Sequence, residues 1–124
     1  MEKIMKQEYR IALCSFGVKN GAVFGREELI GALQEQKVCL REKSHWTTDV
    51  QKEEITVAIG TSADIRMQVL LAGAGKETPK TPESLLCCYV PVREGRVLVL
   101  VGADDAGLMY LLLEMARRVQ EKGA

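Results

Sequence analysis

The chain has 124 residues, of which 17 are basic and 17 acidic, so its formal net charge is zero. This length fits one domain of ordinary size, and 47% hydrophobic residues are enough for a core. A balanced charge gives no electrostatic reason to expect nucleic acid or an anionic membrane as partner. No apolar stretch approaches the ~20 residues of a membrane helix, and residues 1–16 lack a signal-peptide pattern. We therefore expect one soluble domain over residues 1–124.

The cysteines and the single histidine do not form a metal-binding pattern. No CxxC pair occurs among Cys14, Cys39, Cys87 and Cys88, so the spacing of zinc ligands is missing. We expect no metal and no cofactor. Cys87 and Cys88 are neighbours in a strand-like segment and should point to opposite faces of the strand. We interpret the cysteines as small apolar packing residues.

The first half of the chain predicts strands alternating with helices. Residues 9–16 and 53–59 are rich in strand formers, and the second of these segments ends at Gly60. Residues 25–36 carry apolar side chains at helical spacing. The segment KVCLRE, residues 37–42, fits either a short edge strand or a loop.

A second helix is expected after Gly60. Thr61 and Ser62 can cap its N-terminus, and Gly73 can end it. Ile65, Val69 and Leu70 fall near helical spacing and are expected on its apolar side. Residues 73–83, with Gly, Lys, Thr and two Pro, predict a surface loop.

The second half predicts a hairpin followed by a long helix. Residues 84–92 and 96–101 are strands joined by Arg-Glu-Gly, and the continuous apolar run of the second indicates burial on both faces. A helix from Asp104 to about Glu121 follows, with Leu108, Met109, Leu111, Leu112, Met115 and Val119 as its apolar face. The expected fold is α/β, a sandwich in the order β-α-β-α-β-β-α, with a mixed sheet of about four strands covered by helices.

The strand-turn-helix VLVLVGADDAGLMYLLLEMARRV raises the question of a phosphate site. Such a site uses free N–H groups at a helix N-terminus. However, neither GxGxxG nor GK[ST] is present, and Asp104 and Asp105 would repel a phosphate. We instead expect Asp104 to cap the helix and Asp105 to complement its dipole. Adjacent carboxylates at a helix start also suit glycoside hydrolysis poorly, so no catalytic residue is predicted.

This stretch resembles the end of the small N-terminal domain that precedes the catalytic barrel in beta-hexosaminidases, alpha-glucuronidases and O-GlcNAcase-like enzymes. The motif G-x-D-x-x-G-x-x-Y is matched by Gly102, Asp104, Gly107 and Tyr110. The strand ITVAIGT, the segment PESLLCCYV and the helix REELIGALQEQ occupy the places of further family elements. In PESLLCCYV, Glu83 is retained, but Ser84 and Leu85 replace the Gly-Tyr of the family. The chain departs from the family at Ala106, where a basic residue is frequent, and at Leu111, where Gly is frequent.

The resemblance implies a non-catalytic accessory domain of a longer chain, with the catalytic barrel of the same polypeptide as its partner. It also suggests a secreted or periplasmic parent enzyme. If the last helix carries more apolar surface than the sheet can cover, the excess is expected to mark a domain interface. Tyr110 is expected to pack structurally, with its ring buried and its hydroxyl on a polar partner.

Two alternatives rest on the segment EKSHWTTD. Trp46 could stack on a sugar ring, which would make the chain a stand-alone carbohydrate-binding or protein-interaction module. His45 could serve a small stand-alone enzyme, although no orienting acid is evident in the sequence. A Trp in such a segment more often covers the edge of the core, and this packing role is favoured for Trp46.

Overall fold

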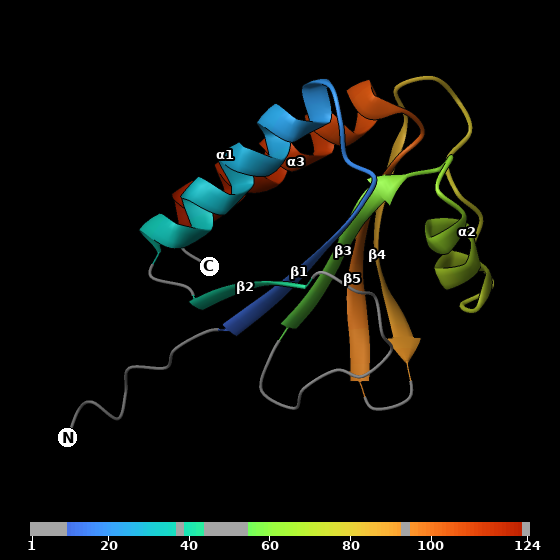
Figure 1. Cartoon of the computed structure of the whole chain (residues 1–124), viewed down its shortest axis with the longest axis horizontal. Coiled ribbons are helices and arrows are strands. Elements are labelled where there is room, and N and C mark those ends of the chain that lie inside the picture. Colours follow the sequence, from blue (N-terminus) through green and yellow to red (C-terminus); the bar gives the residue numbers. More distant parts are fainter. Residues whose placement is uncertain (1–9, 37–38, 44–54, 93–94, 123–124) are drawn as a thin grey trace.

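A computed structural model describes residues 10–36, 39–43, 55–92 and 95–122. Figure 1 shows the arrangement of the helices and strands in these ranges. In chain order they are β1 (Arg10–Phe16), α1 (Gly21–Glu35), β2 (Cys39–Lys43), β3 (Ile55–Thr61), α2 (Ile65–Ala72), β4 (Leu85–Val92), β5 (Gly95–Gly102) and α3 (Asp105–Lys122).

The described strands form one mixed sheet in the order β2-β1-β3-β5-β4. β1 pairs in parallel with β2 and β3, and β3 pairs in parallel with β5. β4 is antiparallel to β5, which confirms the predicted hairpin. The expected α/β fold is confirmed, but the sheet has five strands and not four. The additional strand is β2, so the described part of the ambiguous KVCLRE segment, from Cys39 onward, belongs to an edge strand.

Helices cover both faces of the sheet (Figure 1). α1 and α3 lie on one face, called the helix-pair face below, and α2 lies on the other. Alternation along β5 divides its side chains between the two layers. Leu100 packs under the helix pair, while Val99 and Val101 pack under α2. Burial on both faces explains the continuous apolar run of β5, as predicted.

The two long helices pack against each other as well as against the sheet. α1 begins at Gly21, four residues earlier than expected, because residues 21–25 contact α3. Gly25 lies against Met109 and Leu112 of α3. The sequence-based prediction missed this first turn because it looked for apolar side chains, whereas the contact here depends on small ones.

α2 differs from the prediction in its cap and in its buried face. Asp64, and neither Thr61 nor Ser62, is the N-cap, and its carboxylate accepts the N–H of Arg66 at 2.9 Å. Thr61 still belongs to β3, and the Ser62 hydroxyl donates to the carbonyl of Pro79. Ile65 and Val69 are 69% and 67% exposed, so the expected apolar side was wrong for both. The buried residues are Met67, Leu70 and Leu71.

Candidate functional site

The corner between β5 and α3 depends on two glycines, because neighbouring backbone lies too close to leave room for a side chain at either position. A Cβ on Gly102 would lie 2.2 Å from the backbone nitrogen of Leu108. A Cβ on Gly107 would lie 2.5 Å from the carbonyl oxygen of Ser84. That same carbonyl accepts the N–H of Ala103 at 2.9 Å. The first turn of α3 therefore packs directly on the end of β5 and on the start of β4.

Asp104 fastens this corner with both of its carboxylate oxygens. One oxygen accepts the N–H of Gly107 at 2.8 Å, which is the geometry of a helix N-cap. The other accepts the N–H of Glu83 at 3.1 Å. Glu83 has a positive φ of 63°, a strained conformation for a residue with a side chain. Asp104 thus caps α3, as predicted, and also holds the residue before β4 in place.

Asp105 joins the N-termini of α1 and α3. Its carboxylate accepts a hydrogen bond from the Asn20 side-chain amide at 2.6 Å. Two carboxylates therefore lie where a phosphate would have to bind, and Asp104 already uses the N–H of Gly107. These contacts give the Gly-Asp-Asp turn a structural role in the described molecule.

Tyr110 does not behave as expected. Its side chain is 47% exposed, so the prediction of a buried ring was wrong. It lies six residues beyond the Asp104 cap, between Leu108 and Leu111, which α3 buries. His45 and Trp46 lie outside the described residues.

A groove opens on the helix-pair face, between the sheet and the C-terminal halves of α1 and α3. It is a half-open hollow of about 240 Å³. Its walls are almost entirely apolar. The lining residues come from β1, β3, β4 and β5 and from both helices: Ile11, Leu13, Leu29, Leu33, Ile55, Val57, Tyr89, Leu98, Leu100, Met115 and Val119.

Next to the groove, β4 carries an uncovered apolar stripe. Leu85, Cys87 and Tyr89 alternate along the strand on the helix-pair face, and all three are exposed. We call these three residues the edge stripe. Because α1 and α3 pack on β1, β3, β5 and Leu40 of β2, the helix pair does not cover the edge stripe. The Arg96 guanidinium lies over the Tyr89 ring, 4.1 Å from its centre. Leu111 and Leu112 are buried, so the excess apolar surface expected from them on the last helix is not found there.

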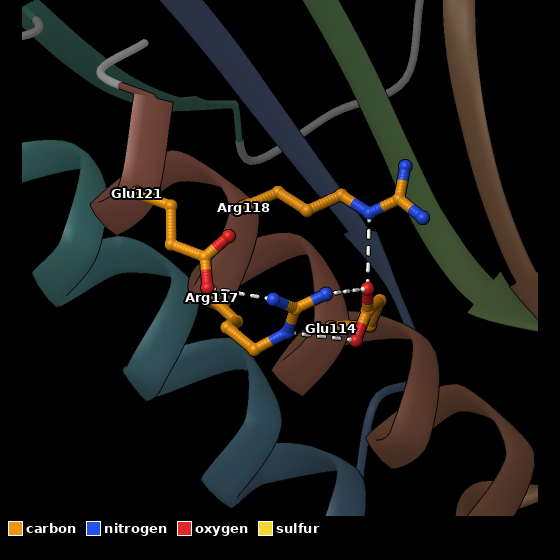
Figure 2. Close-up of polar contacts among 4 residues, drawn as sticks. All are labelled: Glu114, Arg117, Arg118 and Glu121. Atoms are coloured by element: carbon orange, nitrogen blue, oxygen red, sulfur yellow. Dashed lines mark hydrogen bonds and ion pairs between the residues drawn. The ribbon is translucent and has the colours of Figure 1, made fainter.

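The solvent side of α3 is charged and internally paired, as Figure 2 shows. Arg117 bridges Glu114 and Glu121, and Arg118 donates to Glu114 at 3.0 Å. The hydrogen bonds from Arg117 and Arg118 lower the pKa of Glu114 to about 2. Glu114 is therefore a carboxylate over the whole physiological pH range. This network gives α3 a solvated outer face.

The cysteines of β4 point to opposite faces, as predicted. Cys88 packs with the α2 layer, while Cys87 belongs to the edge stripe and is exposed. The interpretation of Cys87 as a core packing residue was therefore wrong. Desolvation raises the pKa of both thiols, which leaves them as weak nucleophiles near neutral pH. Within the described ranges, no group of three His, Cys, Asp or Glu residues is placed to hold a metal ion.

Sequence signals for the groove and the edge stripe are weak, because both depend on what the helices leave uncovered. An exposed Leu and a buried Leu look alike in a strand of alternating exposure.

Comparison with models of known protein families and with curated proteins gave no match for this chain. In the part of the chain that the structure describes, no helix is both long and apolar enough to cross a bilayer.

Proposed function

We propose that this chain is a non-catalytic accessory domain that packs, through the groove, against the catalytic barrel of a glycoside hydrolase. The groove is the observation that carries the docking role. Its apolar walls and half-open mouth suit a protruding aliphatic or aromatic side chain, which would be removed from water on docking. The class of the partner comes from the resemblance of the Gly102–Tyr110 motif.

The position of α3 supports this arrangement. Met115 and Val119 line the groove from the last turns of this helix. A domain connected to the C-terminus of α3 would therefore begin beside the mouth of the groove. The rigid corner at Gly102, Asp104 and Gly107 fixes the direction in which α3 leaves the sheet, and so fixes where such a domain would start.

The chemistry of the described residues suits packing better than catalysis. The carboxylates of Asp104 and Asp105 already accept hydrogen bonds from Gly107, Glu83 and Asn20. The exposed thiol of Cys87 has a raised pKa. These groups support a structural role, and any glycosidase carboxylates would belong to the barrel.

The test begins with the reading frame that continues past the codon of Ala124. If it encodes a barrel, the longer polypeptide should protect the backbone amides of residues 95–100 from hydrogen exchange, relative to the 124-residue chain. Ile55→Lys, at the rim of the groove, should lower the Tm of the longer polypeptide by several degrees. Val23→Lys, at a similarly exposed site on α1, is the control. An immediate stop codon, or unchanged exchange in the groove, would overturn the proposal.

A further inference from the structure

The outer edge of β4 has features of a strand that pairs with another strand. Its sequence, LLCCYVPV, has eight residues and no charged side chain. Natural sheets usually protect such an edge with charges, bulges or covering elements, because the free N–H and C=O groups attract another strand. No strand among the described ranges pairs with this edge.

The register of the hairpin identifies the groups that are free. Ser84 lies opposite Ala103 and accepts its N–H, so this is a hydrogen-bonded pair of the antiparallel ladder. Such pairs alternate with non-bonded ones, so Leu86, Cys88 and Val90 bond to β5. The N–H and C=O groups of Leu85, Cys87 and Tyr89 therefore point outward. The carbonyl of Gly102 agrees, because it points away from β4 and accepts the N–H of Ser62.

Pro91 is in the outward set as well. A proline there loses no bond to β5, because its missing N–H would have faced solvent. It does limit what can pair with the edge, since a new strand finds no donor at this position. The free donors are thus confined to Leu85, Cys87 and Tyr89, whose side chains form the edge stripe.

We propose that β4 pairs antiparallel with β4 of a second copy of this chain, around a two-fold axis at Cys87. In this register Leu85 lies opposite Tyr89 of the second copy, and Cys87 lies opposite its own counterpart. All three outward residues are used in both copies, giving about six backbone hydrogen bonds. A register centred at Cys88 gives a similar number of bonds but sets Leu85 opposite Pro91, which has no N–H, and a register centred at Leu86 brings the turn residue Glu83 into the ladder. The cross-strand side-chain pairs therefore distinguish the registers.

The side chains favour the same register. Both large residues of the edge stripe are nearly half exposed, Leu85 at 44% and Tyr89 at 47%. Pairing places an aliphatic side chain opposite an aromatic one on each side of the axis, a favourable cross-strand pair. The contact is isologous, so it closes at two copies and does not propagate into a fibre. The two five-stranded sheets would join into one continuous sheet, with both helix pairs on the same face.

The first test is the mass of the 124-residue chain in sedimentation equilibrium. We expect twice 13.7 kDa at high concentration, with reversible dissociation on dilution. Cys87→Lys places two ammonium groups at the axis and should weaken the dimer at least tenfold. Val23→Lys on α1 and Ile55→Lys at the groove should leave it unchanged. Circular dichroism checks that each variant folds, and Tyr89→Glu provides a second disruption if Cys87→Lys does not fold.

The second test measures the register. An antiparallel hydrogen-bonded pair brings Cα atoms to ~5.5 Å, within the range that a disulfide can span. Mild oxidation with copper phenanthroline should therefore cross-link the wild-type chain and Cys88→Ser, but not Cys87→Ser. A chain that is monomeric at every concentration, a dimer indifferent to Cys87→Lys, or cross-linking that survives Cys87→Ser would each overturn the proposal. Tyr89 also lines the groove, but the mass and the Cys87 cross-link are measured on the 124-residue chain without a barrel, so their outcome does not depend on the proposed function.

Discussion

The two edges of the sheet are protected very differently. β2, at one edge, has only five residues, and its sequence CLREK includes three charged ones. Glu42 on this strand accepts a hydrogen bond from Arg26 of α1, whose guanidinium also bonds the Ser15 hydroxyl at 2.9 Å. β4, at the other edge, is longer and uncharged, and its apolar edge stripe faces solvent.

The charged edge at β2 therefore disfavours pairing with a further strand, whereas the uncharged edge at β4 permits it. Charged side chains on a short strand discourage pairing, because a second strand would have to desolvate them. At the edge of β4, Pro91 near the end of the strand limits pairing, and the Arg96 guanidinium of β5 lies 4.1 Å from the centre of the Tyr89 ring. β4 is also fixed at its start by the Ser84 carbonyl and by Asp104, so its free edge is presented in a defined position.

The largest expected effect follows from removing the space at the start of β4. Gly107→Ala places a methyl group against the Ser84 carbonyl, which must then move. We expect a loss of about 3 kcal/mol in the free energy of unfolding, as for overpacked sites. Urea denaturation followed by circular dichroism measures it. Gly31→Ala in α1 is the matched control, because its new methyl group meets nothing within 4 Å, and it should be neutral or slightly stabilising.

A smaller effect is expected from the cap that holds the same corner. Asp104→Ala removes the acceptor for the N–H groups of Gly107 and Glu83. Loss of a helix N-cap costs about 1–2 kcal/mol. Asp104→Asn keeps one acceptor oxygen and should recover part of the loss in the same urea titration. Equal stability of the Ala and Asn variants would show that the hydrogen bonds of this side chain do not hold the corner.

A comparable but pH-dependent effect is expected at the N-cap of α2. The hydrogen bond from the Arg66 side chain is the main reason that the pKa of Asp64 lies below 3.8 in the folded chain. A depressed pKa means that the stabilisation is fully present above the unfolded value and is lost as the pH falls below it. Asp64→Asn should therefore flatten the pH dependence of stability below pH ~4, by on the order of 1 kcal/mol. Thermal unfolding at a series of pH values would contradict this if both proteins followed one curve.

The smallest effect on stability is expected at the protected edge. Glu42→Gln removes the charge that faces Arg26, in a pair whose carboxylate is exposed. Exposed ion pairs contribute about 0–1 kcal/mol, so stability should change little. The variant sharpens the comparison when combined with Cys87→Lys. If weakening the charge on β2 produced a dimer that no longer depends on β4, the charges of β2 would be shown to prevent pairing there.

Much of this fold could be predicted from the residues alone. The hairpin of β4 and β5, the long α3 and the double burial of β5 follow from local patterns in apolar and turn residues. The Asp104 cap was predictable too, because a cap needs only one side chain and the helix that follows it. The position of His45 and Trp46 stays a prediction, since both lie outside the described residues.

The remaining features depend on contacts between segments distant in sequence. β2 was ambiguous because its five residues, three of them charged, form a strand only when their backbone pairs with β1. The first turn of α1 and the buried side of α2 were misjudged because their partners, α3 and the sheet, decide which face is covered. The apolar pattern of the sequence therefore determined that this chain forms an α/β sandwich. Only the tertiary structure decided that the two helices on one face would stop short of the edge stripe, which leaves the groove and the edge stripe exposed in the described part of the chain.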